Sequence, residues 1–214
     1  MRSGLTYWEQ SRAPVVADII GRFVPCTARV AVDIGCGSGA LTKELSTKFN
    51  RIIGIDIDYN AIRPQRDNSV QLLVGDAIRL PLQSNSVDFV FSYGALHHTQ
   101  LAKALTEIVR VTAPQGKVVL IDFCTIEATA SPGRLDYTLT VLRAFNDYRH
   151  RLGVVPALRI IMFRLSSTWW RHQREDSFLT LDAFSREYGA KLTGADIHQD
   201  GDRMTVIWSR ARDK

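Results

Sequence analysis

Five short runs of apolar, largely β-branched residues recur along the first 123 residues, and stretches with helical spacing lie among them. The runs are predicted strands over residues 28–34, 51–57, 70–75, 86–92 and 117–123. Strands that are apolar throughout, rather than at every second residue, are typical of a parallel sheet with helices on both faces. The order of elements therefore predicts an α/β fold with a mostly parallel sheet.

The spacing of apolar residues also predicts the helices and a final hairpin. Helices are expected over residues 14–24, with Pro14 in the first turn, and over 40–49, 101–111 and 181–188. Two further β patterns, at 191–197 and 203–210, are joined by HQDGD and predict a closing β-hairpin. The predicted sheet then has seven strands, and 214 residues without a second set of patterns predict a single domain over 1–214.

Three glycines directly after the first predicted strand are the first sign of a bound ligand. Gly35, Gly37 and Gly39 lie in VDIGCGSG, where the strand turns into a helix. In a parallel sheet this turn lies at the carboxyl edge, where ligands bind. Glycine there lets a ligand approach the bare backbone. The pattern also satisfies a loose dinucleotide fingerprint, so on its own it leaves the ligand open.

Three aspartates lie at the ends of three successive predicted strands. Asp33 precedes the glycines, Asp56 ends the second strand and Asp76 ends the third. A carboxylate at the position of Asp56 can accept both hydroxyl protons of a ribose. Asp33 would repel a pyrophosphate and attract the ammonium group of an amino acid. The set favours a nucleoside cofactor with a cationic amino-acid end over a dinucleotide.

Four segments together carry a family resemblance: VDIGCGSG, GIDID, GDAIRLPLQSNSVDFVFSYGALHH and LTEIVRVTAPQGKVVLIDF. In order and spacing they resemble the class I S-adenosylmethionine-dependent methyltransferases, most of all the small-molecule (methyltransferase type 11) group that includes the quinone C-methyltransferases. The resemblance covers residues 28–123, and the final hairpin by pattern only. It implies a Rossmann-like fold and an enzyme that uses S-adenosylmethionine, releases S-adenosylhomocysteine and methylates a small, apolar or aromatic acceptor at oxygen or carbon.

The resemblance also implies which residues bind the cofactor. They are Asp33, Gly35, Cys36, Gly37 and Gly39 for the methionine part, Asp56 for the ribose hydroxyls, Ile57, Asp76 and Ala77 for the adenine, and Ser92 at the end of the fourth strand. The segment TAPQGK departs from the family pattern, which usually has two glycines after the proline. Gln115 occupies the first of those positions. This departure concerns a turn and leaves the cofactor residues unaffected.

A proton acceptor is needed if the methylated atom is a hydroxyl oxygen or an acidic carbon. His97 and His98 follow the fourth predicted strand and are the candidate catalytic residues. The alternative is that one of them caps or packs the following helix and that neither moves a proton. Tyr93, at the same strand end, is a weaker candidate for the base and a candidate contact for the substrate.

The positive charge of the chain is concentrated in one segment. Residues 134–174 contain eight arginines, no lysine and two aspartates, a net charge of +6 when the whole chain carries +5. The resemblance places acceptor-specifying insertions here, so a helical lid is expected over about 125–180, with Trp169 and Trp170 as candidate substrate contacts. Five residues follow helical spacing and are expected to face the core: Leu158, Ile161, Met162, Leu165 and Trp169.

Arginines interleaved with large apolar side chains leave several partners open. They suit a lid over a lipophilic or anionic acceptor, or contact with a membrane surface. They also suit RNA, with arginine on phosphate and tryptophan on bases, or a solvated helix that packs on a neighbouring helix or subunit. An RNA methyltransferase is the nearest alternative function, weakened by the near-neutral remainder of the chain. A nucleotide-dependent oxidoreductase and a non-catalytic cofactor-binding protein are the alternatives from other classes.

Cysteine usage and hydropathy indicate the compartment. Cys26, Cys36 and Cys124 are scattered, which argues against a disulfide framework or a zinc site, so no metal is expected, and it fits a reducing cytosol. The N-terminal segment is too polar for a signal peptide, and no apolar run approaches membrane-spanning length. The sequence predicts a cytoplasmic protein whose membrane contact would be peripheral, and leaves the oligomeric state open.

Overall fold

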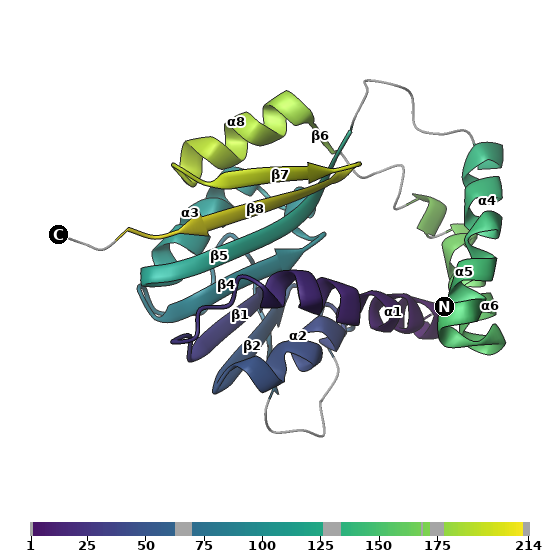
Figure 1. Ribbon diagram of the computed structural model, residues 1–214, viewed down its shortest axis with the longest axis horizontal. Coiled ribbons are helices and arrows are strands. Elements are labelled where there is room, and N and C mark those ends of the chain that lie inside the picture. The colour runs from purple at the N-terminus through teal and green to yellow at the C-terminus, as the bar shows by residue number, and fades with distance from the viewer. Residues whose placement is uncertain (1, 63–69, 126–133, 168, 172–177, 212–214) are drawn as a thin grey trace.

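The computed structural model describes residues 2–62, 70–125, 134–167, 169–171 and 178–211. Its centre is a sheet in the order β3-β2-β1-β4-β5-β8-β7, with β6 beside β5 (Figure 1). The strands are β1 (Val30–Ile34), β2 (Arg51–Asp56), β3 (Val70–Val74), β4 (Val87–Tyr93), β5 (Thr112–Thr125), β6 (Leu179–Thr180), β7 (Asp196–Asp200) and β8 (Arg203–Ser209). Strands β1 to β6 pair in parallel and β8 pairs antiparallel with both β5 and β7. The predicted α/β fold is confirmed, and the two-residue β6 is an unpredicted eighth strand.

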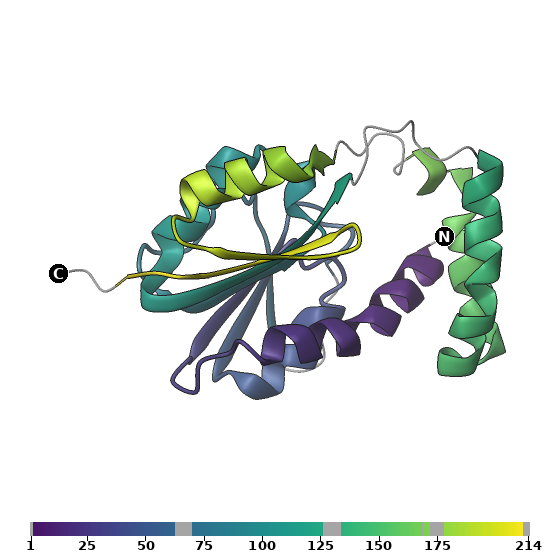
Figure 2. The same cartoon turned by 45° about the horizontal axis from the view of Figure 1, so that its top comes forward.

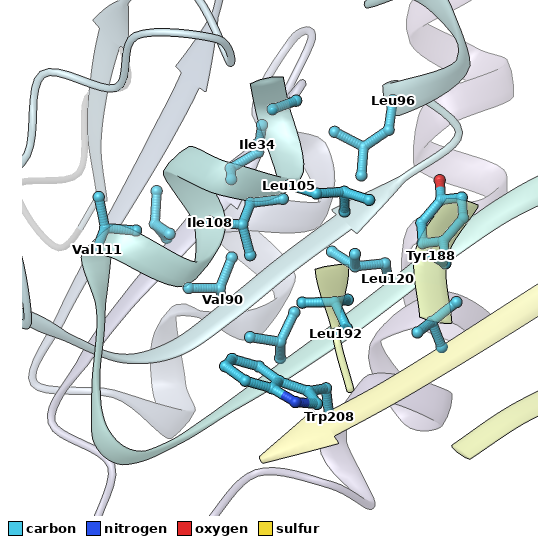
Figure 3. Close-up of a cluster of buried hydrophobic side chains, with 14 of the residues drawn as sticks. Ile34, Val90, Leu96, Leu105, Ile108, Val111, Leu120, Tyr188, Leu192 and Trp208 are labelled. Carbon is cyan, nitrogen blue, oxygen red and sulfur yellow. The ribbon is translucent and has the colours of Figure 1, made fainter. Parts of the chain in front are cut away.

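Helices cover both faces of the sheet, as the apolar strands require. Helices α1 (Arg2–Gly21) and α2 (Ala40–Leu45) lie on one face, where Val16, Ile20 and Leu45 pack against the strands. Helices α3 (Leu101–Val111) and α8 (Leu181–Lys191) lie on the other (Figure 2). On that face the buried cluster joins α3, α8 and β8, as Figure 3 shows for Leu105, Tyr188 and Trp208.

Several element boundaries differ from the sequence prediction. Helix α1 begins at Arg2 and contains Pro14 in its interior, whereas the prediction began the helix there. Residues on both sides of Pro14 are buried, so packing of Ala13 and Val16 holds the helix through a residue that removes one of its hydrogen bonds. The predicted helix over 40–49 is α2 followed by a short 3₁₀ turn, η1 (Ser46–Lys48).

The strands near the C-terminal part of the sheet are also displaced. Strand β5 begins at Thr112, five residues earlier than predicted, because Thr112 pairs with Val87 ahead of a register shift whose extra residues lie in β5. The first hairpin strand begins at Asp196 and not at 191, because α8 continues to Lys191 and Gly194, with φ 77°, turns the chain into β7.

The arginine-rich segment forms a helical layer of its own. Helices α4 (Arg134–Arg143), α5 (Phe145–Leu152) and α6 (Val154–Arg164) stand beyond the sheet, beside the N-terminal half of α1 (Figure 1). Helix α6 packs against α1 and α5. Tyr137, Val141 and Ile161 form the buried centre of this layer, with Trp169 and Trp170 packed around it. The layer therefore has a separate small core.

The buried face of α6 is not the predicted one. Ile161 is buried as expected, and Leu165 and Trp169 are half-buried, but Leu158 and Met162 are 47% and 72% exposed. The residues that bury instead include Ile160, which is not one of the five expected to face the core. The helix contacts both α1 and α5, so its buried side is broader than one stripe. In the described part of the chain, no helix combines the length and hydropathy needed to cross a bilayer.

Candidate functional site

Two recesses open at the carboxyl edge of the parallel strands. The first, with a volume of about 480 Å³, lies at the ends of β2 and β3 and is called the β2–β3 recess. The second, about 170 Å³, lies beneath α1 and is called the α1 recess. Gly35 lines both, so the two recesses meet at the glycine-rich turn. An elongated ligand can therefore occupy both and cross the bare backbone between them.

The glycine-rich turn needs its glycines for two reasons. Gly35, Gly37 and Gly39 all have positive φ, at 75°, 53° and 76°. A side chain at Gly35 would also overlap Ala95, and one at Gly37 would come within 2.8 Å of the Glu9 carboxylate. The turn is held by the backbone of β2, since Gly35 and Cys36 both donate N–H to Ile55 O. The Ala95 contact explains the glycine at 35 even before a ligand is considered, whereas at 37 the positive φ is the stronger reason, because the end of the Glu9 side chain can move aside.

Asp56 ties the glycine-rich turn to the β2–β3 recess. Its Oδ2 accepts the Gly37 N–H at 2.7 Å and its Oδ1 accepts the Asp58 N–H at 2.9 Å. A carboxylate has about four lone-pair positions, so these two bonds leave acceptor capacity for the hydroxyls of a bound sugar. Ile57 lines the same recess and is 70% exposed, which makes it an apolar surface for a flat ring.

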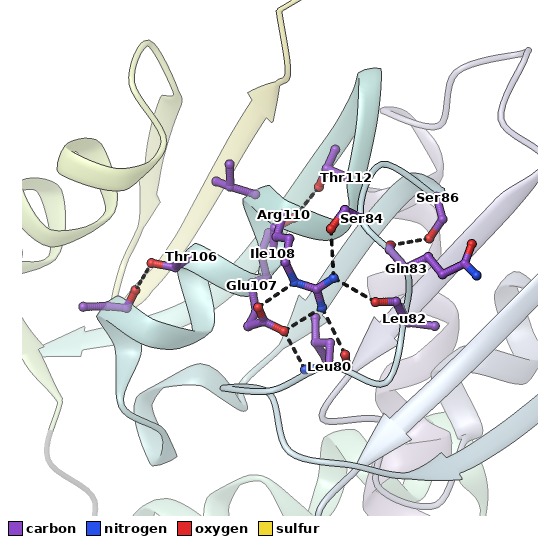
Figure 4. A network of polar contacts seen from close by, with 12 residues as sticks. Leu80, Leu82, Gln83, Ser84, Ser86, Thr106, Glu107, Ile108, Arg110 and Thr112 are labelled. Carbon is purple, nitrogen blue, oxygen red and sulfur yellow. Dashed lines mark hydrogen bonds and ion pairs between the residues drawn. The ribbon is translucent and has the colours of Figure 1, made fainter.

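Asp76 and Ala77 lie on the other side of the β2–β3 recess. Asp76 Oδ1 accepts the Ile78 N–H at 3.0 Å, which shapes the turn after β3. The loop that follows is fastened to α3, because Glu107 accepts the Leu80 N–H and Arg110 donates to Leu80 O and Leu82 O (Figure 4). The hydrogen bonds from Arg110 are also the first cause of a lowered Glu107 pKa. This network holds the wall of the β2–β3 recess in place, although its own residues do not line the recess.

Asp33 is the most unusual carboxylate of the α1 recess. It is 1% exposed, and its Oδ2 accepts the Thr42 hydroxyl at 2.6 Å. Burial raises its pKa to about 7; the Thr42 hydrogen bond opposes this rise, and the charges of Asp56 and Glu9 add to it. A cation placed in the recess would remove this electrostatic strain. These carboxylates therefore suit the ammonium group of an amino acid better than any anion.

Charged residues of α1 complete the α1 recess. Glu9 accepts the Ser38 hydroxyl, and Arg12 Nη1 donates to the Tyr93 hydroxyl at 2.7 Å. Burial raises the Tyr93 pKa, and the Arg12 charge opposes the rise. Tyr93 and Phe123 meet edge to face, with ring centroids 6.0 Å apart, and both line the recess. Sequence reasoning missed Glu9 and Arg12 because it began the helix at Pro14.

His97 lies in a third, smaller recess of about 140 Å³, which shares Phe123 with the α1 recess. Its Nδ1 is 2.5 Å from Asp122 Oδ1, and its backbone N–H donates to Asp122 Oδ2. Asp122 is 2% exposed and also accepts the Tyr188 hydroxyl at 3.1 Å. Asp122 went unpredicted, although its place at the end of the LIDF strand was a usable signal. With Nδ1 held by a carboxylate, Nε2 is the nitrogen available to a proton.

The other predicted site residues have different surroundings. His98 lines the β2–β3 recess, and its ring is 3.9 Å from that of His97. Ser92 is buried and donates its hydroxyl to Ile34 O, which ties β4 to β1 outside the linings of the two larger recesses. Gly39 directly precedes α2. Cys36 is buried in the α1 recess, and this burial raises the pKa of its thiol far above the ordinary range.

Trp169 and Trp170 lie in the helical layer and not along these recesses. Trp169 packs on Phe163 and Trp170 on Tyr137, with ring centroids 4.9 and 5.3 Å apart. Within the described residues, no group of three or more His, Cys, Asp or Glu side chains is arranged to hold a metal ion.

Comparison with known proteins identifies the central part of the chain. Residues 32–120 match the family described as "Methyltransferase domain". This region is therefore similar to methyltransferase domains. The match spans β1 to β5, and so includes the glycine-rich turn, the three strand-end aspartates and both histidines.

Relatives and solved structures agree with this assignment. A demethylmenaquinone methyltransferase of Renibacterium salmoninarum is 27% identical over 158 residues, 72% of this chain and 65% of that protein. One of Corynebacterium kroppenstedtii is 31% identical over 105 residues, 49% and 46%. The chain thus spans about half to two thirds of the length of these relatives. A phosphoethanolamine N-methyltransferase of Haemonchus contortus, solved with S-adenosylhomocysteine, has the same fold, with a TM-score of 0.59, 19% identity and coverage of 87% and 38%.

Proposed function

We propose that the protein transfers the methyl group of S-adenosylmethionine to a small apolar or aromatic acceptor. The observation that carries the proposal is the pair of joined recesses, one with acceptors for a ribose at Asp56 and one with the buried carboxylate of Asp33. The β2–β3 recess takes the adenosine, with Ile57, Asp76 and Ala77 around the adenine. The α1 recess takes the methionine end. The names of the demethylmenaquinone methyltransferases support an aromatic acceptor.

The chain's own contribution to the reaction is alignment. When bound, the sulfonium supplies an activated methyl group, so the protein has only to present an acceptor in line with it. Tyr93 and Phe123 form an aromatic wall beside Gly35, which positions a flat acceptor at the junction of the recesses. Holding two reactants in register can supply up to roughly 7–11 kcal/mol in favourable intramolecular systems. Helix α1 lines the α1 recess with Ala13 and Val16, which adds apolar surface beside the junction.

Of the two histidines, we assign the proton acceptor to His97. Asp122 holds the Nδ1 side of its ring and can stabilise the imidazolium that forms when Nε2 takes a proton. His98 faces the recess assigned to adenosine, so it belongs with cofactor binding. The same proton acceptor would serve methylation at a phenolic oxygen or at an acidic ring carbon.

Cofactor binding is the first test of the proposal. By calorimetry the protein is expected to bind S-adenosylmethionine and S-adenosylhomocysteine, and to bind NAD far more weakly. Asp56→Ala should weaken binding by about 1.5–3 kcal/mol, the range for hydrogen bonds to a charged group. Asp58→Ala is the matched control, since Asp58 is an exposed carboxylate two residues along that lies outside the recess lining. NAD binding as tight as that of S-adenosylmethionine would contradict the proposed methyltransferase function.

The role of His97 is tested with the acceptor that turns over in a screen with labelled cofactor. His97→Ala should lower turnover by roughly 10²–10⁴-fold and leave cofactor affinity nearly unchanged. Asp122→Asn should lower turnover less and displace the pH profile, because the ring loses its charged partner. His98→Ala is the matched control and should act mainly on cofactor affinity. A full rate in His97→Ala would make this histidine a packing residue.

A further inference from the structure

The helical layer exposes an unusual amount of apolar surface. In the described part of the chain, seven of the twelve exposed large apolar side chains lie between residues 135 and 162. They form one stripe on each of two helices: Leu135, Leu139 and Leu142 on α4, and Val154, Val155, Leu158 and Met162 on α6. Spacings of three and four residues align side chains along one helix face. Exposed stripes of this kind mark surfaces that contact something else.

The charges around these stripes are mostly positive. Arg143, Arg149, Arg151 and Arg159 are exposed on α4 to α6, whereas the segment's acidic residues are Asp136 and Asp147. Arg151 pairs with Asp147 at 3.1 Å, so that aspartate does not neutralise the others. The layer therefore presents leucine, valine and methionine beside a net positive charge. Apolar side chains flanked by arginine are what an anionic bilayer surface binds.

Other occupants fit these observations less well. A second copy of the chain would bring the same arginines against one another, and like charges facing across an interface oppose association. A nucleic acid would engage the arginines but gives the exposed leucines and Met162 nothing to bury. A bilayer interface takes both, because the apolar stripe enters the acyl boundary while the arginines stay with the head groups.

We propose that α4 to α6 dock the protein on an anionic membrane surface, from which it draws a lipophilic acceptor. This inference rests on the proposed function for its acceptor, but the docking itself does not. The helical layer stands on the side toward which the carboxyl ends of β4 and β5 point, as Figure 1 shows. Helix α6 packs on α1, and α1 roofs the recess in which Tyr93 and Phe123 lie. A bilayer-bound acceptor would thus meet the enzyme at the layer next to the methyl-transfer site.

The test is sedimentation with vesicles of phosphatidylcholine alone and of phosphatidylcholine mixed with phosphatidylglycerol. Binding is expected with the anionic vesicles and should be about tenfold or more weaker with the neutral ones. The double change Leu158→Glu and Met162→Glu should remove most of the binding. Val15→Glu is the matched control, since Val15 is a half-exposed apolar residue on the sheet-bound part of α1. The charge-reversing changes Arg143→Glu and Arg149→Glu should weaken vesicle binding. The same change at the exposed Arg186 of α8, Arg186→Glu, should not.

Several results would overturn the proposal. They are absent binding to anionic vesicles, equal loss in the Val15 control, or a dimer in light scattering that the Leu158 and Met162 changes dissolve. Tight, salt-sensitive binding of tRNA that is lost on reversal of Arg143 and Arg149 would also replace the membrane by RNA. Calorimetry with S-adenosylmethionine on the same samples separates the two proposals. If the wild-type protein binds vesicles but no cofactor, the function fails while the docking surface stands.

Discussion

Asp33 is a residue whose protonation changes on folding within the ordinary pH range. Its pKa rises from 3.8 to about 7, first because the carboxyl is buried and then because Asp56 and Glu9 lie near it. Between these two pH values the folded, cofactor-free domain holds a proton that the unfolded chain has released. The stability contributed by this protonated carboxyl is therefore fully present below pH 3.8 and is lost as the pH rises through 7.

This sign gives a pH prediction for the cofactor-free protein. Between about pH 5 and pH 8 the free energy of unfolding, measured in urea, should fall with pH more steeply in the wild type than in Asp33→Asn. The asparagine variant lacks the titration and keeps an oxygen that can accept the Thr42 hydroxyl. Binding of a cation should reverse the trend, so the affinity for S-adenosylmethionine should rise over the same interval. Parallel pH curves for the two proteins would contradict a buried, proton-holding Asp33.

Some candidate site residues can be recognised from a local sequence pattern, and others cannot. Asp33, Asp56 and Asp76 could be proposed from the sequence, because a carboxylate at the end of an apolar strand can be recognised without a structure. Glu9 and Asp122 act through partners far along the chain, Ser38 and His97, which no local pattern reveals. The location of Trp169 and Trp170 within a separate core is likewise a product of tertiary packing.

The elements follow the sequence where one interaction dominates and depart from it where two compete. Helix α3 spans the residues predicted for it, because its buried residues, Ala104, Leu105, Ile108 and Val111, lie along a single apolar face. Helix α1 overrides a proline, and α6 buries a face rotated from the one predicted, because each contacts two partners. A periodicity argument assumes one buried side, so it fails for helices that pack between others.

The turn before the central part of β5 offers a prediction at this scale. Gln115 has φ 65°, in the left-handed region where side chains other than glycine are strained by about 1–2 kcal/mol. Gln115→Gly should raise the free energy of unfolding by about 0.5–1 kcal/mol, because relief of this strain is partly offset by the greater freedom of glycine in the unfolded chain. The measurement is a urea midpoint at constant m-value.

The neighbouring glycine supplies the matched control. A Cβ at Gly116 would lie 2.7 Å from Ala113 O and 3.1 Å from Val87 O, both backbone atoms. Gly116→Ala should therefore lower the midpoint. If both substitutions act in the same direction, the turn is not held in the geometry described.

On the scale of the whole molecule, the sheet with its flanking helices and the helical layer have separate cores, and α1 joins them. The sheet and its flanking helices bury two large clusters, and the layer buries Tyr137, Val141 and Ile161. Stability can differ between such units, so one can open while the other stays folded. Sequence reasoning predicted a helical insertion but not that its core would be independent of the sheet, because that depends on how far α1 extends.

This division predicts how the tryptophans act. Replacing Trp169 and Trp170 by alanine removes the rings packed on Phe163 and Tyr137. Removing a buried ring lowers the free energy of unfolding by about 3–5 kcal/mol. The decrease should be smaller here, because both tryptophans are half-buried. The double variant should lose acceptor turnover and keep its affinity for S-adenosylmethionine. Hydrogen exchange should become faster over residues 134–164 and stay slow in β1, β4 and β5. Faster exchange in those strands, or weaker cofactor binding, would mean that the layer and the sheet fold as one cooperative unit.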